Sequence, residues 1–381
     1  MFDEIAAAAD DAQALFLQAG QNLVRSGQYH QLFDLRLMQR RHELGLPLEN
    51  VTALDDLEET LREGLEKGYL DACREVGQLL LEQGRAREAW TYLRPAGEKM
   101  ALREWLARAV ADQEHADELI ELALYEAIDA ERGFAWLLAQ RGTCNAITEL
   151  EGLSGSLPIE DQKACSAVLV RHMHDELLNN LRGHLKRLEL ESPASSSIVE
   201  LLTEHPALLA DGAYHIDTSH LSTTVRFARL LTDPALLRQA IELAEYGRKL
   251  APDLQYPDRP PFEEIYPAHL LLFQATLGDD VESAVTYFCE QAQTQEIEQH
   301  GTGAIETYLI LLVRVSRPEV ALEEFARLVP VDGAVSPHAP TLLQLARASG
   351  NWDRYLTICQ ERDDVVGFAS GQLEKRGQQD R

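Results

Sequence analysis

The sequence predicts an all-α protein built as an array of antiparallel helix hairpins. Leu, Ala and Glu dominate the composition and runs of β-branched residues are scarce, which favours helix over strand. Apolar residues recur mostly at steps of three and four, the spacing of one helix face. No β-hairpin turn and no alternation of strand with helix interrupts this pattern.

The composition indicates a folded chain with a strong negative charge. Of 381 residues, 45% are hydrophobic and 26% are charged, which is typical of globular proteins. The 63 acidic residues exceed the 35 basic ones, so the formal net charge is −28. Such a field opposes binding to nucleic acid and to an anionic membrane surface. It favours a basic partner, or simply solubility.

The ends and cysteines of the chain predict a cytoplasmic protein. The N-terminus carries Asp3 and Glu4 and lacks the basic region of a secretory signal. No apolar stretch reaches the roughly 18 residues that a membrane-spanning helix needs. The five cysteines are odd in number, scattered and without a C-x-x-C pair, which argues against disulfides and zinc ribbons.

The first part of the chain is expected to form three helices, at residues 5–26, 28–44 and 55–67. Gly27 and Gly68 are interpreted as the points where the first and third of them end. Asp55 or Asp56 is the expected N-cap of the third helix.

The clearest hairpin lies at residues 73–96. Gly77 lets its second helix approach the first, and Gly84 makes the turn because glycine adopts left-handed backbone angles cheaply. Ala89 is the small residue expected at the closest crossing, and Leu93 with Ala96 closes the pair.

Further helices follow along the chain, with turns at Gly142, Gly278 and Gly350. They are expected at residues 99–111, 115–127, 129–141, 159–190, 197–204, 222–231, 233–249, 263–277, 280–293, 302–315, 318–328, 341–349 and 351–361. The long one, 159–190, has a continuous apolar stripe from Val170 to Leu188. The residues from Glu374 onward are expected to be frayed.

With glycine, alanine and leucine at these positions, residues 73–96 resemble the tetratricopeptide repeat, a 34-residue helix-turn-helix unit. The hairpins here are unevenly spaced, so the chain resembles a divergent form of that repeat. The resemblance implies that hairpins stack into a right-handed α/α superhelix with a concave surface. Linkers near 152–158 and 192–197 divide the chain into regions 1–151, 152–210 and 211–381, unless it forms one continuous solenoid.

The resemblance implies a binding protein rather than an enzyme. An acidic superhelical groove would hold a protein or peptide, expected to be basic, with no nucleic acid or membrane involved. No catalytic residue and no cofactor is assigned, because phosphate-binding, dinucleotide-binding and zinc-protease patterns are missing. A subunit of a homo-oligomer is a third hypothesis, and the oligomeric state is left open.

The alternative function is a divalent transition metal held by His215, Asp217 and His220. The His-x-Asp-x-x-His pattern supplies two imidazoles and a carboxylate from one loop. Possible additional ligands are Glu176, Glu264 and His269. Helix capping by Asp217 would account for the same residue pattern without a metal.

The loop at residues 256–269 is unusually rich in proline and aromatic residues. It either packs across the groove and closes it, or forms a packed connector between two hairpins.

Overall fold

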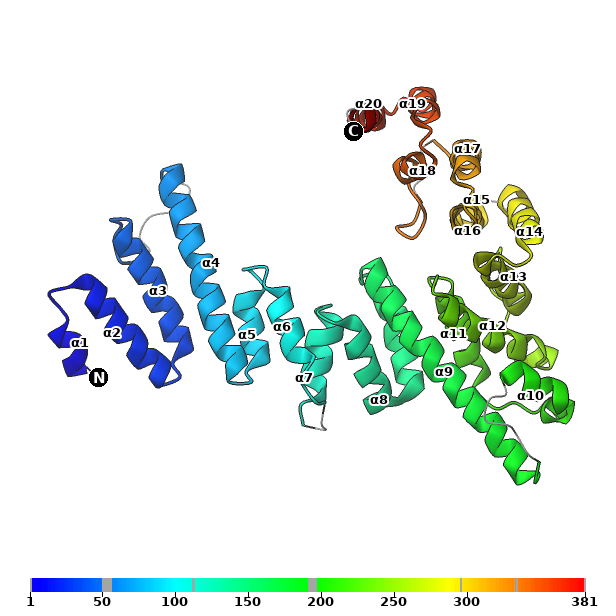
Figure 1. Ribbon diagram of the computed structural model, residues 1–381, viewed down its shortest axis with the longest axis horizontal. Helices are drawn as coiled ribbons and strands as arrows, with labels where there is room; N and C mark the ends of the chain where they lie inside the picture. Colours follow the sequence, from blue (N-terminus) through cyan, green and yellow to red (C-terminus); the bar gives the residue numbers. More distant parts are fainter. Residues whose placement is uncertain are drawn as a thin grey trace. The chain divides into compact units, whose positions relative to one another are not determined.

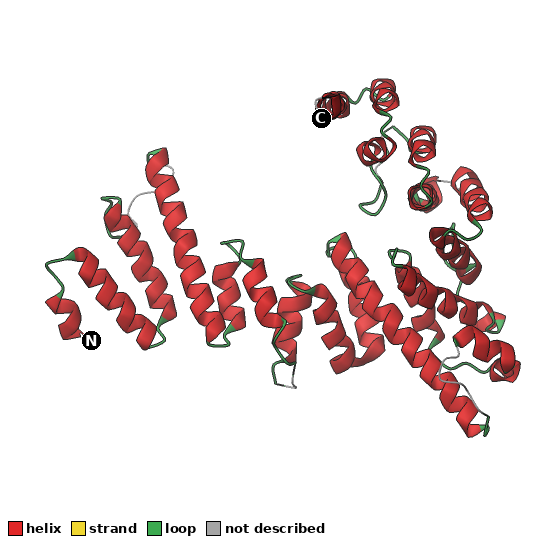
Figure 2. Cartoon of the chain, viewed as in Figure 1, coloured by secondary structure: helices red, strands yellow, loops and turns green. Residues whose placement is uncertain are grey.

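The computed structural model describes residues 2–49, 57–111, 114–190, 197–294, 297–331, 333 and 335–379. All regular structure in these ranges is helical, as the sequence predicts (Figures 1 and 2). The chain forms two compact units, Met1–Gln140 and Arg141–Arg381, and each is described by itself. No helix in these ranges is both long enough and apolar enough to cross a bilayer.

The first unit is a series of helices of very different length, from 5 to 24 residues, and most pack on the next helix along the chain. They are α1 (Phe2–Ala7), α2 (Ala12–Arg25), α3 (Tyr29–Glu43), α4 (Glu59–Glu82), α5 (Ala86–Leu93), α6 (Lys99–Leu106) and α7 (Ala116–Ile120), followed by the π-helical turn η2 (Glu121–Tyr125). Helix α8 (Ala130–Leu153) begins in this unit and breaks at Gly142, where φ is 75°, close to the predicted helix end.

The hairpin of α4 and α5 has the geometry expected from its small residues. Gly84 adopts φ 76° at the turn. A Cβ added at Gly77 would lie 2.5 Å from Leu93 Cδ2, so only glycine allows the two helices to approach this closely. Ala89 is fully buried at the crossing.

Two predictions near the start of this unit are wrong. Residues 5–26 form two helices, because the Asp11 side chain accepts hydrogen bonds from the Gln13 and Ala14 amides and starts α2 afresh. Helix α4 runs through Gly68 without ending there. A Cβ at Gly68 would lie 2.3 Å from Arg40 Cγ, so this glycine serves packing against α3 rather than helix termination. The predicted caps Asp55 and Asp56 lie outside the described residues.

The helices around 99–125 are shorter than predicted. Helix α6 ends after the fully buried Leu106, five residues before the predicted end at 111. The predicted helix 115–127 is α7 followed by the π-helical turn, and Ala127 beyond it has φ 53°.

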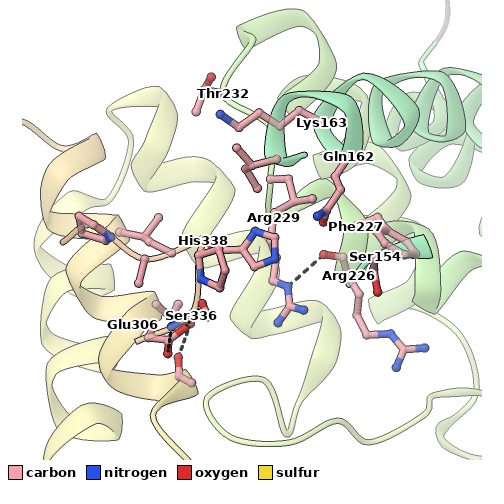
Figure 3. Close-up of a pocket in the computed structure, with 18 of the residues that line it drawn as sticks. Ser154, Gln162, Lys163, Arg226, Phe227, Arg229, Thr232, Glu306, Ser336 and His338 are labelled. Atoms are coloured by element: carbon pink, nitrogen blue, oxygen red, sulfur yellow. Dashed lines mark hydrogen bonds between the residues drawn. The ribbon is translucent and has the colours of Figure 1, made fainter. Parts of the chain in front are cut away.

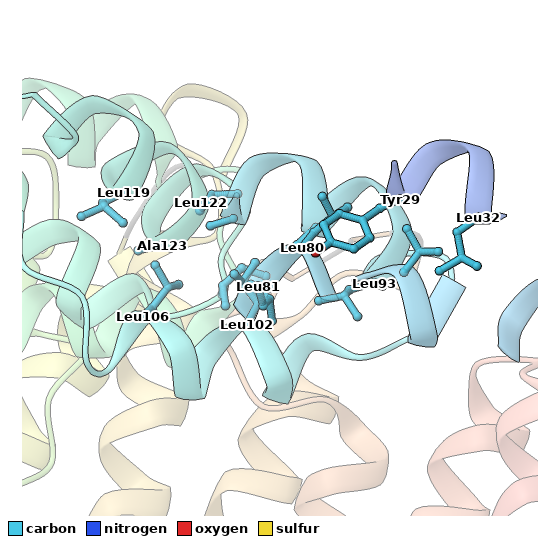
Figure 4. Close-up of a cluster of buried hydrophobic side chains, with 14 residues drawn as sticks. Tyr29, Leu32, Leu80, Leu81, Leu93, Leu102, Leu106, Leu119, Leu122 and Ala123 are labelled. Atoms are coloured by element: carbon cyan, nitrogen blue, oxygen red, sulfur yellow. The ribbon is translucent and has the colours of Figure 1, made fainter. Parts of the chain in front are cut away.

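A large part of the core of the first unit is a cluster of buried side chains contributed by successive helices (Figure 4). Its members include Tyr29, Leu32, Val76, Leu80, Leu81, Ala89, Leu93, Leu102, Leu106, Leu119, Leu122 and Ala123. Because no single hairpin could bury this surface alone, each helix depends on its neighbours for stability.

The second unit has the same construction over a longer stretch. Its helices after α8 are α9 (Ile159–Arg187), α10 (Ile198–Glu204), α11 (Thr218–Ala228), α12 (Pro234–Arg248), α13 (Ile265–Leu277), α14 (Val281–Thr294), α15 (Ile297–His300), α16 (Gly303–Arg314), α17 (Pro318–Leu328), α18 (Leu342–Ser349), α19 (Trp352–Glu361) and α20 (Val365–Gln379), with 3₁₀ turns η3 (Pro206–Gly212) and η4 (Pro252–Leu254). Most of these helices pack against the next one along the chain.

Two expectations for this unit need correction. The stripe of α9 is fully buried from Val170 to Leu185, but Leu188 is 49% exposed because it is the C-cap residue, past the last turn of the helix. The predicted fraying from Glu374 is not seen as far as Gln379, because these residues continue α20, which packs on α19. The turns at Gly278 and Gly350 have the left-handed angles expected of them.

Candidate functional site

The second unit contains a cavity of about 880 Å³. Its walls come from the end of α8, the start of α9, α11 with the turn that follows it, α13, α16, the segment 336–340 and the start of α18. Figure 3 shows Arg226 and Arg229 on one side of this view and Glu306 with Ser336 on the other. Helices far apart in the sequence therefore form one concave surface.

Much of the cavity wall is apolar. The apolar lining residues are Ile159, Phe227, Leu230, Leu272, Ile310, Val313, Pro337, Ala339 and Pro340. Phe227, Leu230 and Ile310 are only partly buried, so they keep surface that an occupant would cover.

Four basic residues line the same cavity: Lys163, Arg226, Arg229 and Arg314. Lys163 Nζ lies 2.7 Å from Glu160, and Arg226 Nη2 lies 4.0 Å from Glu151. Among the described residues, Arg229 and Arg314 have no carboxylate partner within 4.0 Å.

Both of these arginines are fixed at the C-terminus of α11. Arg229 Nε donates to the Arg226 carbonyl oxygen over 3.0 Å, and Arg314 Nη2 donates to the Arg229 carbonyl oxygen over 2.5 Å. Carbonyls at a helix C-terminus lack helical partners and carry partial negative charge, so cations are stabilised there. The two contacts hold the guanidinium groups in place and leave further N–H groups for the cavity.

The surroundings of the two arginines are partly dehydrated. Burial lowers the pKa of Arg314 to about 10, and its Nη1 is buried without a hydrogen-bond partner. Desolvation also lowers the pKa of Arg229, although its side chain remains accessible and Asp258 acts in the opposite direction. Both guanidiniums stay protonated at neutral pH.

The guanidinium of Arg229 packs over two stacked rings. Its Cζ lies 5.0 Å from the centre of the Phe262 ring, and Phe262 stacks on His269 with 4.1 Å between ring centres. His269 is fully buried and its Nδ1 donates to the Ile265 carbonyl oxygen. Burial, and then the charge of Arg229, hold the pKa of His269 well below its usual value.

The segment 336–340 is attached to α16 through Glu306. The carboxylate accepts hydrogen bonds from the Ser336 amide over 2.9 Å, from the Ser336 hydroxyl and from the Thr302 hydroxyl (Figure 3). All of these donors are uncharged. Glu306 therefore holds the cavity wall, keeps its negative charge, and forms no ion pair with an arginine in the described part of the chain.

Two of the three predicted metal ligands, His215 and Asp217, have protein partners of their own, and His220 lies in the first turn of α11. Asp217 is the N-cap of α11 and accepts from the Ser219 and His220 amides. His215 Nε2 lies 2.8 Å from His184 Nδ1, and the His215 amide donates to the Tyr246 hydroxyl. Hydrogen bonding to Ser219 lowers the pKa of Asp217.

The predicted additional ligands lie in separate surroundings. Glu176 is 3.5 Å from His172 on α9, Glu264 is an exposed residue before α13, and His269 is buried under Phe262. Within the ranges that the structure describes, no three His, Cys, Asp or Glu side chains are grouped to hold a metal. A metal at His215, Asp217 and His220 stays a prediction.

Residues 256–264 of the predicted loop 256–269 form the packed connector between α12 and α13, and residues 265–269 are the first turn of α13 itself. Phe262 and Tyr266 are buried, and the Tyr287 hydroxyl donates to the Pro261 carbonyl oxygen. Its contribution to the cavity is indirect, through the Phe262 ring below Arg229.

Comparison of the chain with protein-family models, characterised proteins and solved structures finds no match.

The arginines of the cavity are missed by sequence reasoning. Arg226, Arg229 and Arg314 form no motif and are scattered among 35 basic residues of an acidic chain. The sequence offers one signal: Arg226 and Arg229 are three residues apart near the end of a helix, a spacing that puts both on one helix face.

Proposed function

We propose that this protein is a non-enzymatic binding protein that holds a peptide segment of a partner protein in the cavity of its second unit. The observation that carries the proposal is the cavity itself, in which helices from α8 to α18 converge around about 880 Å³ of space. Stacked helical hairpins generate extended concave surfaces, and such surfaces bind extended segments. A tetratricopeptide-like superhelix remains the interpretation of the array that we favour.

The lining supports peptide binding rather than catalysis. Partly buried apolar side chains alternate with fixed polar groups, which gives both affinity and orientation. Among the described cavity residues, the Ser336 hydroxyl does donate to the Glu306 carboxylate, but the same carboxylate also accepts from the Ser336 amide and the Thr302 hydroxyl, so we interpret it as an anchor for the segment 336–340. The basic partner expected in an acidic groove stays a prediction, and the cavity described here is lined by four basic and three acidic side chains.

The experiment is selection of a phage-displayed random peptide library on the immobilised full-length protein, repeated on Thr307→Trp. Thr307 lines the cavity on α16, and an indole there fills space that the peptide needs. We expect the wild type to enrich related sequences and Thr307→Trp to lose them.

The matched control is Thr357→Trp on α19. Thr307 and Thr357 each donate to the carbonyl four residues earlier, over 2.8 Å and 3.0 Å, but only Thr307 lines the cavity. Thr357→Trp should enrich the same sequences as wild type. Failure of the wild type to enrich any sequence, or unchanged selection by Thr307→Trp, would contradict the proposed function.

A further inference from the structure

We propose that the cavity recognises an acidic side chain of the bound segment, an Asp or Glu with apolar neighbours, through the guanidinium groups of Arg229 and Arg314. This inference rests on the proposed function and specifies the chemistry of the occupant. It is opposite in sign to the partner that the net charge of −28 suggests.

The charges around the cavity leave these two arginines uncompensated. Each of the three lining carboxylates is already engaged: Glu160 with Lys163, Glu151 with Arg226, and Glu306 with Ser336 and Thr302. The C-terminus of α11 offsets about half a charge. Four basic and three acidic side chains line the cavity, so its formal charge is 4 − 3 = +1, and this surplus lies with Arg229 and Arg314, which form no ion pair in the described part of the chain. Asp258 acts on Arg229 in the opposite direction.

The donors of the two arginines are positioned before anything binds. Arg314 uses Nη2 on the Arg229 carbonyl, and its Nη1 is buried and unpartnered. Arg229 uses Nε on the Arg226 carbonyl and lies over the Phe262 ring. A buried donor without an acceptor is costly, and a carboxylate supplies charged acceptors suited to the fork of a guanidinium. Arg314 Nη1 is itself closed to the cavity, so the carboxylate would meet the remaining N–H groups and the charge of the two guanidiniums.

The rest of the lining indicates what lies beside the carboxylate. Phe227 and Leu230 flank Arg229 in the sequence at the end of α11, Ile310 and Val313 lie on α16 with Arg314, and all of them line the cavity. Apolar side chains of the segment would cover these residues. An apolar flank also lowers the local dielectric, which strengthens the charged contact.

A peptide carboxylate fits better than a polyanion. Nucleic acid brings many phosphates, and each would meet the field of 63 acidic residues against 35 basic ones. One acidic side chain places a single charge where the local field is positive. The cavity is also far larger than one free phosphate ion requires.

The test measures fluorescence anisotropy of three labelled peptide pools with the full-length protein. The pools share random apolar flanks and differ at the central position, which is Asp or Glu, Asn or Gln, or Lys or Arg. We expect the acidic pool to bind about tenfold more tightly than the amide pool, and the basic pool to bind most weakly.

Arg229→Gln and Arg314→Gln should each remove the acidic preference while retaining binding of the amide pool. Arg248→Gln is the control, because Arg248 lies on α12, outside the cavity, and pairs with Glu245. It removes the same charge and should leave the preference unchanged. Circular dichroism of each variant identifies loss of fold, and Arg229→Lys, which keeps the charge, should retain part of the preference.

Three outcomes would overturn the inference. Equal binding of the acidic and amide pools, or tightest binding of the basic pool, would exclude recognition of a carboxylate. The proposal that the cavity binds a peptide would still stand. Displacement of the acidic pool by inorganic phosphate or by oligothymidine more readily than by free glutamate peptide would reassign the site to phosphate chemistry. Failure of every pool to bind would instead contradict the proposed function.

Discussion

At the scale of the residue, small side chains determine how closely the helices approach. Gly77 and Gly183 are both inside helices, but a Cβ at Gly77 meets Leu93 at 2.5 Å whereas a Cβ at Gly183 meets only Arg187 Nη1 at 3.7 Å. The first glycine is required by packing and the second only adds flexibility to the unfolded chain.

The two glycines therefore predict opposite effects of alanine. Gly77→Ala should lower the free energy of unfolding by about 1–3 kcal/mol through overpacking against Leu93. Gly183→Ala should raise it by about 0.5–1 kcal/mol. Urea-induced unfolding followed by circular dichroism measures both. A neutral Gly77→Ala would show that the α4–α5 approach has room that the structure does not show.

His215 predicts a pH dependence of stability. Burial, with the nearby His184 and Arg187, lowers the pKa of His215 to about 4 from an ordinary value of 6.5. As the pH falls from about 6.5 to about 4, His215 is therefore protonated in the unfolded chain but stays neutral in the folded one. The free energy of unfolding falls over that window.

The comparison is between wild type and His215→Gln, which does not titrate. Lowering the pH from about 7 to about 5 should cost the wild type roughly 1 kcal/mol more than the variant, after allowance for partial exposure. Urea midpoints at each pH measure the difference. Parallel pH profiles of the two proteins would mean that His215 titrates normally.

At the scale of the element, one carboxylate holds a connecting segment in place. The segment 336–340 contributes Pro337, Ala339 and Pro340 to the cavity, and its hydrogen bonds to α16 are made through Glu306. Its position therefore depends on charge-assisted bonds from Ser336 rather than on its own secondary structure.

Glu306→Ala should release this segment. Loss of the charge-assisted bonds is expected to speed amide exchange of residues 336–340 about tenfold and to weaken peptide binding, since part of the wall is lost. Hydrogen–deuterium exchange with mass spectrometry measures the first effect. Glu319→Ala, at an exposed position on α17, is the control and should change neither.

At the scale of the whole molecule, the surplus of acidic residues acts on stability. The ion pairs described here are mostly exposed, such as Arg74–Glu98 and Arg354–Glu323, and exposed pairs contribute about 0–1 kcal/mol each. Repulsion within a net charge of −28 acts throughout the chain.

Salt should therefore stabilise this protein. Screening shortens the range of charge interactions to about 10 Å at 0.1 M salt, so the midpoint of thermal unfolding should rise between low salt and that concentration. Differential scanning calorimetry in sodium chloride and in tetramethylammonium chloride measures the rise, and agreement of the two salts distinguishes screening from sodium binding. A falling midpoint would show that the ion pairs outweigh the repulsion.

Local patterns in the sequence determined the helices and many of their turns. Three such patterns are the apolar stripe on α9, the left-handed glycine at position 84 and the helix cap at Asp217. Each depends on residues close together in the chain, so a short stretch of sequence is enough to predict it. The failure at Gly68 has the same origin, because a packing glycine and a terminating glycine look alike until the partner, Arg40, is known.

Only the tertiary structure decided where the cavity lies and which charge it carries. Arg229 and Arg314 are 85 positions apart, and their meeting at the end of α11 depends on how α11, α13 and α16 pack. The charge of a whole chain is a sum that the sequence contains, but the charge of a surface depends on which side chains converge there. That convergence is a property of packing between distant segments, which no local pattern records.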